Sequence, residues 1–316
     1  MTASLRLVFL GTPEFAVPAL RALAVTRHPV VGVVSQPDRP RGRGRVVEPT
    51  PVVAAARELG LPLLKPEKIG DESALAWLRG LRPDLGIVVA FGQFIPKSAR
   101  ELPPLGMINA HASLLPRWRG AAPIEWALDS GDSKTGISVM RVVKEMDAGD
   151  VCLTRELAIG AEETAGELSA RLSALAGPAL VEAVERIASG GARFEPQDPA
   201  RVTLAPKLDR AWARLDFAQP AERVLRRVRA ATPRPGVDLE LVTARKRLSV
   251  LRARIGASHS GVTPGTFRAE GGKLAVACAD RWLDLVEVRL AGKRALSAEE
   301  LLRGFRVADG ERAESV

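Results

Sequence analysis

The sequence is poor in the residue types that build several classes of site. It has no Tyr, only 4% aromatic residues, two cysteines and three histidines among 316 residues. Cys152 and Cys278 are far apart and lack metal-ligand spacing, so we interpret them as small core residues of a reducing compartment. The histidines are too few and too scattered for a His-based metal centre. We therefore expect no metal site.

Two further patterns are missing. No apolar run approaches the ~18 residues that a membrane-spanning helix needs. The first strand ends in Gly11-Thr-Pro-Glu rather than Gly-x-Gly-x-x-Gly, which gives little support to a nicotinamide oxidoreductase. The first residues run directly into a predicted strand instead of a signal peptide. We expect a cytoplasmic protein without a membrane partner.

What the sequence does contain is ample apolar material and an uneven distribution of charge. Hydrophobic residues make up 46% of the chain, and its length favours two domains. Residues 1–200 contain 23 basic and 23 acidic residues, whereas residues 201–316 contain 23 and 14, so the net charge of +9 comes from the last third. This asymmetry indicates a polyanion-binding surface, although arginines that merely solvate the surface are an equal alternative.

Short apolar runs alternate with helical patterns along the first two hundred residues. This alternation predicts an α/β fold with a doubly wound, mostly parallel, Rossmann-like sheet. The expected strands are 5–10, 30–35, 61–64, 85–91 and 137–143, and the expected helices are 15–23, 51–59 and 71–80. Ligands of such sheets bind at the carboxyl ends of strands. Residues 91–93 lie at one such end, although they also fit an ordinary strand exit.

The last hundred residues have a different pattern. Short alternating runs predict about five strands of a small barrel of the oligonucleotide-binding (OB-like) type. The expected strands are 237–242, 248–255, 265–269, 274–278 and 283–290, after an arginine-rich helix at 221–230. We expect one domain over 1–190, a linker over 191–208 and the barrel over 209–316.

One stretch, Gly106 to Pro123, concentrates polar residues directly after a buried-looking strand. Asn109 and His111 are two residues apart, and this spacing puts both side chains on one face of a strand. An amide can donate to an oxygen that gains charge, and an imidazole can move a proton near neutral pH. The plainer alternative is that both side chains are structural, and the number of polar neighbours weakens that alternative without removing it.

Two other segments stand out. Gln36 to Arg45 alternates arginine with Pro and Gly, which predicts a charged loop suited to phosphate, or else a solvated one. The segment that contains Asp147, Asp-Ala-Gly-Asp, follows a predicted strand. A carboxylate there could orient the imidazole of His111, or it could simply form a turn.

The stretch from Asn109 to Pro123 resembles the signature of the methionyl-tRNA formyltransferase family. Its first part, Asn109-x-His111-x-Ser113-Leu-Leu-Pro116, is similar to a motif shared by the wider family that formylates amines with 10-formyltetrahydrofolate. The continuation, Arg-Trp-Arg-Gly-Ala-Ala-Pro123, is far more specific. The resemblance covers nearly the whole chain.

The resemblance implies an activity and a set of site residues. The activity is transfer of a formyl group from the co-substrate 10-formyltetrahydrofolate to the α-amine of methionyl initiator tRNA, without a metal, by a protein that we expect to be a monomer. The implied catalytic residues are Asn109, His111 and Asp147, although Ala148 stands where many relatives have Thr. The implied co-substrate-binding residues are Ser113, Leu114, Leu115 and Pro116. The implied tRNA-binding residues are Arg43, in an insertion loop, and Lys207, in the linker.

Three other functions are compatible with parts of the sequence. A formyltransferase for a small amine would share Asn109, His111 and Asp147 but would not need the arginine loop or the basic barrel. A hydrolase that releases the formyl group is a second possibility. A non-catalytic tRNA-binding protein is the third, but it would require a broken catalytic set.

Overall fold

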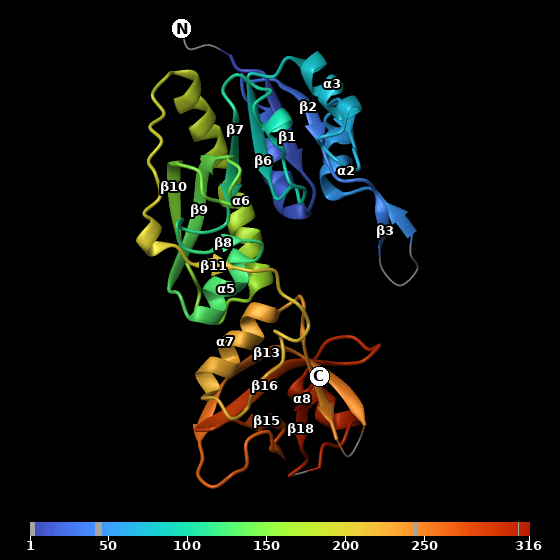
Figure 1. Ribbon diagram of the computed structural model, residues 1–316. Helices are drawn as coiled ribbons and strands as arrows, with labels where there is room; N and C mark the ends of the chain where they lie inside the picture. The colour runs from blue at the N-terminus through green and yellow to red at the C-terminus, as the bar shows by residue number, and fades with distance from the viewer. Residues whose placement is uncertain (1–3, 42–45, 243–244, 309) are drawn as a thin grey trace. The chain divides into compact units, whose positions relative to one another are not determined.

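The computed structural model describes residues 4–41, 46–242, 245–308 and 310–316, and it divides into two compact units (Figure 1). The first unit comprises Met1–Gly120, Lys134–Ala158 and Ser169–Ala205. The second comprises Ala121–Ser133, Ile159–Leu168 and Pro206–Val316. Two short segments that lie between parts of the first unit in the sequence thus belong to the second unit. No helix in the described part of the chain combines the length and the hydropathy needed to span a membrane.

The first unit is built on a seven-stranded sheet in the order β10-β9-β7-β6-β1-β2-β5. The strands in that order are Val151–Ala158, Lys134–Arg141, Met107–His111, Leu85–Val89, Leu7–Gly11, Val30–Val34 and Leu63–Leu64. Strands β5, β2, β1, β6 and β7 are parallel, and β9 and β10 are antiparallel additions. The prediction of a doubly wound, mostly parallel sheet is confirmed.

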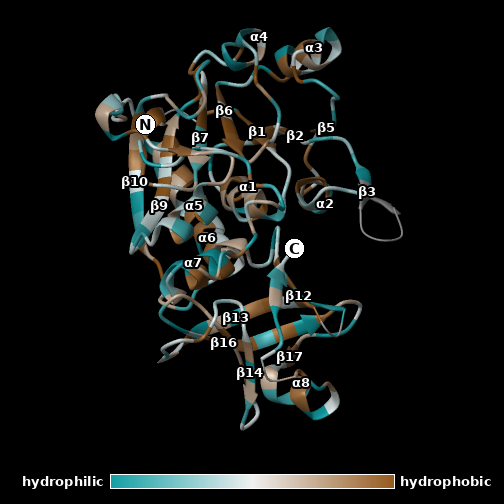
Figure 2. Ribbon diagram, turned by 60° about the horizontal axis from the view of Figure 1, so that its bottom comes forward, coloured by the Kyte–Doolittle hydropathy of each residue, from teal (hydrophilic) through white to brown (hydrophobic). Residues whose placement is uncertain are grey.

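The central strands are apolar along their whole length because both faces of the sheet are covered. Every residue of β1 and β6 is buried, and Figure 2 shows these strands in brown. Strand order reverses between β1 and β6, which is the switch point where such sheets bind ligands. Here the side chains of Thr12 and Gln36 both donate to the carbonyl oxygen of Phe91, at 2.8 and 3.1 Å. These hydrogen bonds join the ends of three neighbouring strands.

Local sequence signals explain where helix α2 begins. Thr50 caps α2 by accepting a hydrogen bond from the backbone of Val53, and Pro51 occupies the first helical position. The long helix α6 continues through Pro178 without ending. The helices are η1 (Glu14–Ala16), α1 (Val17–Ala24), α2 (Pro51–Glu58), α3 (Glu72–Leu81), α4 (Lys97–Arg100), α6 (Ala165–Ala188) and η2 (Pro199–Arg201). Two short pairs complete the unit, β3 (Arg39–Arg41) with β4 (Val46–Glu48) and β8 (Arg119–Gly120) with β11 (Leu204–Ala205).

The second unit contains an antiparallel sheet in the order β14-β15-β16-β13-β12-β18. The strands in that order are Phe267–Glu270, Lys273–Ala277, Arg281–Leu290, Lys246–Ser258, Val237–Leu241 and Ala313–Ser315, and β17 (Leu296–Ser297) pairs with β16. An antiparallel bridge between Thr266 and Arg312 joins the two outer strands, so the sheet closes on itself. The expected small barrel is confirmed, although the closing strand β18 was not predicted.

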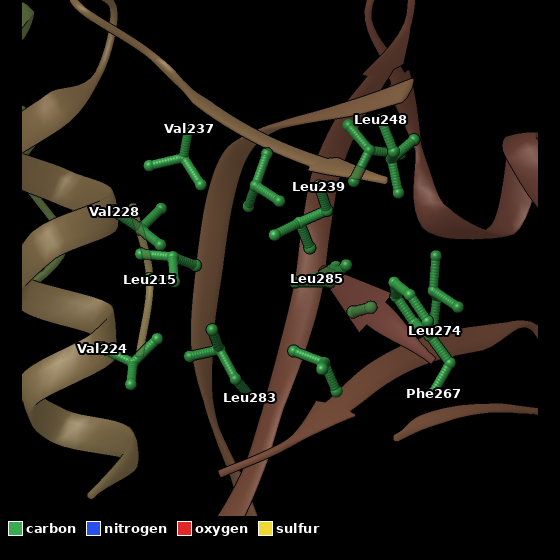
Figure 3. Packing of buried hydrophobic residues seen from close by; sticks show 14 of the residues in the cluster. Leu215, Val224, Val228, Val237, Leu239, Leu248, Phe267, Leu274, Leu283 and Leu285 are labelled. Carbon is green, nitrogen blue, oxygen red and sulfur yellow. The ribbon is translucent and has the colours of Figure 1, made fainter. Parts of the chain in front are cut away.

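Apolar side chains fill the interior of this barrel. Val224 and Val228 of α7 (Ala221–Ala231) pack into the same core as Leu239, Phe267 and Leu285 (Figure 3). The other helices are α5 (Pro123–Ser130) and α8 (Ala298–Gly304), which Ser297 caps through a complete capping box. The core contains few aromatic rings, as the composition requires.

Candidate active site

Strand β7 places Asn109 and His111 on the same face of the first unit's sheet. In the pairing with β9, Asn109 lies opposite Met140 and His111 lies opposite Ser138. The His111 side chain is buried, whereas Asn109 is half-buried. No hydrogen bond joins the Asn109 amide to any residue within the described ranges, so the amide is available to a ligand.

The hydrogen bond of His111 fixes which ring nitrogen can exchange a proton. Nε2 lies 2.8 Å from the carbonyl oxygen of Trp118. A carbonyl can only accept, so Nε2 carries a hydrogen and donates it. Nδ1 is left facing Asp147, with Oδ2 at 3.6 Å. That distance is too long for a direct hydrogen bond but short enough for an ion pair when the imidazole is protonated.

Asp147 lies in the turn between β9 and β10, in an unusual backbone conformation. Its φ is +51°, in the left-handed region that side chains rarely adopt. The backbone N–H of Gly120 donates to Oδ2 at 2.9 Å, and the Asp147 side chain remains 16% exposed. The same oxygen therefore meets a backbone N–H and the His111 ring. The structure thus brings His111 and Asp147 together from separate segments.

The loop that follows β7 is held by hydrogen bonds within the loop and to strand β9. The hydroxyl of Ser113 is buried and donates to the carbonyl oxygen of Arg117 at 2.6 Å. The hydroxyl of Ser138 donates to the Ser113 carbonyl and accepts from the N–H of Leu115. The Ser113 side chain therefore stabilises the loop from inside. Leu114, Leu115 and Pro116, the other residues predicted to bind the co-substrate, are half-buried.

Gly120 is required at the end of this loop. Its φ is +131°, and a Cβ at this position would collide with the carbonyl oxygen of Ala205. The close approach forms the β8–β11 pair, in which Arg119 lies beside Leu204. Glycine thus allows the chain to present its N–H to Asp147.

Residues within the expected linker, 191–208, also hold this loop, a contribution that the sequence pattern does not indicate. The hydroxyl of Thr203 accepts from the N–H of Trp118 at 2.9 Å, and the carbonyl of Thr203 accepts from the N–H of Arg119 at 2.9 Å. These contacts fix the carbonyl that holds His111. Nothing local to Thr203 in the sequence signals such a role, because its partners are more than 80 residues away.

The remaining candidates do not form a second site. Cys152 is buried, and this burial raises the pKa of its thiol, so it is unsuited to act as a nucleophile. No cluster of three or more potential metal ligands occurs in the ranges that the structure describes. Lys207 is exposed at the beginning of the last stretch of the second unit. Arg43 lies outside the described residues.

Two family models match the chain. One, described as formyl transferase, matches residues 5–184, and the other, described as formyl transferase, C-terminal domain, matches residues 207–306. A methionyl-tRNA formyltransferase from Chromohalobacter salexigens is 42% identical over 99% of this chain and 98% of its own. The enzyme of that name from Pseudomonas paraeruginosa is 44% identical over 96% of each chain.

Solved structures show the same fold at lower identity. The sugar 3N-formyl transferase WlaRD, solved with dTDP and 5-N-formyl-THF, has a TM-score of 0.64 at 11% identity and covers 92% of this chain and 100% of its own. HypX from Aquifex aeolicus, solved with tetrahydrofolic acid, has a TM-score of 0.61 at 16% identity, over 98% of this chain and 51% of its own.

Proposed function

The chain belongs to the methionyl-tRNA formyltransferase family, and we propose that Asn109, His111 and Asp147 are the residues that perform its reaction. The reaction moves a formyl group from 10-formyltetrahydrofolate to the α-amine of methionine on initiator tRNA. The observation that carries the proposal is the grouping of His111 Nδ1, Asp147 Oδ2 and the Gly120 N–H around one position.

Formyl transfer requires stabilisation of an oxyanion. The amine attacks the formyl carbon and forms a tetrahedral intermediate whose oxygen carries negative charge. Asn109 supplies the donor for that oxygen, because its amide is half-exposed and shares the face of His111. One such donor is worth on the order of 3 kcal/mol of barrier.

The reaction also requires a proton to travel from the amine to the leaving N10 of the folate. His111 takes this proton at Nδ1, directly or through water, since Nε2 already donates to Trp118. Asp147 stabilises the imidazolium that forms, and the Gly120 N–H holds the carboxylate in place. The collapse of the intermediate breaks the bond between carbon and N10, and the proton passes to N10. No covalent enzyme intermediate is needed.

Apolar side chains near the reacting groups suit the flat ring system of a folate. Leu114, Leu115 and Pro116 form one half-buried edge after β7. Val143 and Met146, in the turn that contains Asp147, are 37% and 71% exposed. Exposed apolar side chains next to a polar site commonly line a ligand pocket. We place the co-substrate between these two edges, with Ser113 acting from inside the loop.

The tRNA is assigned to the arginine loop and to the basic second unit. Arg43 and Lys207 are the proposed contacts, and the domain functions are catalysis for 1–190, connection for 191–208 and tRNA binding for 209–316. Phosphate contacts by arginine and lysine should make tRNA binding fall steeply with salt. We further propose that the protein acts as a monomer in the cytoplasm, where charged tRNA and folate occur together.

The direct test is to mix the protein with 10-formyltetrahydrofolate and methionyl initiator tRNA and to measure formyl-methionyl-tRNA. Asp147→Asn should lower kcat by about 10²–10⁴-fold, because proton transfer loses its carboxylate, with tRNA affinity nearly unchanged. Asp150→Asn, in the same segment, is the control and should leave kcat unchanged. Full activity of Asp147→Asn would remove Asp147 from the mechanism.

The same assay with small amines in place of the tRNA tests the alternative substrates. Formylation of a nucleotide sugar at rates similar to the tRNA would contradict the assignment of the second unit. Release of free formate without any acceptor would indicate a hydrolase.

A further inference from the structure

The segment that follows α6 returns to the edge of the first unit's sheet. Glu195 and Val151 form an antiparallel bridge through hydrogen bonds of 2.9 and 3.0 Å between their backbones. One residue earlier, the ring of Phe194 lies under the Arg141 guanidinium, 3.8 Å from its carbon to the ring centroid. The segment therefore has a fixed register against the turn that contains Asp147.

Gln197 is the next side chain along this segment that reaches the turn. Its Nε2 donates to the backbone carbonyls of Asp147 and Gly149, both at 2.8 Å. Its Oε1 accepts from Nε of Arg119 at 2.9 Å. An amide has two N–H donors on one side and an acceptor on the other, so a single residue satisfies all these partners. A carboxylate of the same shape could not donate to either carbonyl.

These bonds act on a backbone that does not hold its conformation by itself. Asp147, with its φ of +51°, lies in a sparsely populated backbone region, and holding a non-glycine residue there costs free energy. The described contacts that oppose this cost are the Gly120 N–H on the carboxylate and the Gln197 amide on the carbonyl. If the Gln197 contacts are removed, we expect the turn to relax toward negative φ and the carboxylate to move away from His111.

Arg119 connects the same amide to the other side of the site. The carbonyl of its neighbour Trp118 accepts from His111, and the N–H of its neighbour Gly120 donates to Asp147. Gln197 thus joins the turn that presents the carboxylate to the loop that orients the imidazole. We propose that Gln197 is a positioning residue for formyl transfer, which sets the separation of His111 and Asp147 without touching the substrates. This inference rests on the proposed role of Asp147.

The test compares two variants at Gln197 with a matched control. Gln197→Glu keeps the shape but loses both donors, and Gln197→Ala loses every contact. Each should lower kcat by about 10²-fold, the effect of a misplacement near 1 Å, while KM for the tRNA stays within about threefold. Ser73→Glu introduces the same charge at an exposed position of α3, in the first unit, and should leave kcat unchanged. All kinetics are measured well below the Tm of each variant.

A double-mutant cycle separates positioning from a general structural role. If Gln197 acts through Asp147, adding Gln197→Glu to Asp147→Asn should change the single-turnover rate by less than about threefold, because the coupled carboxylate is already absent. A crystal structure of Gln197→Ala should show Asp147 outside the left-handed region. The same fold-loss from Gln197→Glu in both backgrounds, or an unmoved Asp147 in that crystal structure, would overturn the inference.

The outcomes also separate this inference from the proposed function. Wild-type kcat in Gln197→Glu together with a large loss in Asp147→Asn would overturn only the role of Gln197. Wild-type kcat in Asp147→Asn would overturn the proposed mechanism itself.

Discussion

Two groups of charged and polar side chains, one in each unit, contain similar residues but serve opposite purposes. In the first unit, His111 Nδ1 lies 3.6 Å from Asp147 Oδ2, and the half-buried Asn109 shares the strand face of His111. In the second unit, the buried carboxylate of Asp129 in α5 accepts from Nε and Nη2 of Arg227 in α7, at 2.8 and 2.9 Å. Arg223 donates to the carbonyl oxygen of Asp129 at 2.6 Å. The first group is open to a ligand, and the second is closed on itself.

The comparison shows what charge counts in a sequence leave undecided. The arginines of α7 contribute to the basic excess that suggested a polyanion surface. Yet Arg223 and Arg227 bind Asp129, and Arg229 donates to the carbonyls of Gly160 and Glu163. These guanidiniums join α7 to its neighbours within the second unit. Arg294 and Arg303 also pair with carboxylates, those of Glu300 and Glu299, but these two arginines are 77% and 71% exposed and remain accessible from solvent.

Asp129→Ala gives the largest expected effect and tests whether the closed group is structural. Breaking a buried pair while its partners stay charged destabilises by about 3–5 kcal/mol, and the lower end applies here because Arg223 is 40% exposed. Chemical denaturation should report this loss, while kcat at low temperature stays near the wild-type value. The control is Glu222→Ala, which removes a surface pair with Arg226. A loss of kcat without a loss of stability would place Asp129 in the active site.

Asn109→Ala is the matching test of the open group. The loss of one oxyanion donor should lower kcat by about 10²–10³-fold, because the amide is needed only when charge develops. The Tm should hardly change, since the described structure gives this amide no internal hydrogen bond. Stopped-flow formylation and thermal unfolding check the two parts. A large fall in Tm with normal kcat would make Asn109 a structural residue.

Gly120→Ala should affect both stability and rate, unlike either change above. The added Cβ meets the Ala205 carbonyl at a φ of +131°, which costs of order 1–3 kcal/mol. The N–H that holds Asp147 must then shift, so kcat falls as well. Gly131→Ala is the control. Gly131 also has a positive φ, +78°, but a Cβ there would meet the flexible side chain of Arg226 rather than a backbone carbonyl. It should lower stability alone, and an effect on kcat equal to that of Gly120→Ala would contradict the local explanation.

The sequence predicted those parts of the fold and site that follow from local pattern. The buried runs of β1 and β6 and the period-two spacing of Asn109 and His111 were sufficient for the sheet and for one face of the site. Strand β10 was missed because it is an edge strand with charged residues such as Arg155 and Glu156. The role of Asp147 was predicted only from the family resemblance. The position of its carboxylate depends on a positive φ, which no pattern in the sequence indicates.

The contacts that complete the site come from far along the chain. Gln197 and Thr203 lie 50 and 85 residues from partners that they hold, Asp147 and Trp118. No periodicity or motif links such positions, because each contact is a side chain bound to a backbone group. The closing strand β18 was missed for a related reason, since three residues near the end of the chain become a strand only by pairing with β12.

Glu125→Gln gives the smallest expected effect and sharpens the comparison within one helix. Glu125 lies one turn before Asp129 in α5, but burial raises the pKa of its carboxyl, whereas Asp129 has arginine partners. The folded protein therefore holds the Glu125 proton to higher pH than the unfolded chain does. The contribution of Glu125 to stability is present below its unfolded pKa and is lost as pH rises through the folded pKa.

Glutamine keeps the shape of Glu125 and cannot ionise. Glu125→Gln should thus raise Tm slightly at pH 7 and leave it unchanged below about pH 4, where both states of the wild type are protonated. The exposed Glu222→Gln is the control and should show no such difference between the two pH values. A lower Tm at pH 7 would mean that the folded state stabilises the Glu125 carboxylate. Glu125 would then resemble Asp129, and the contrast between the two residues would fail.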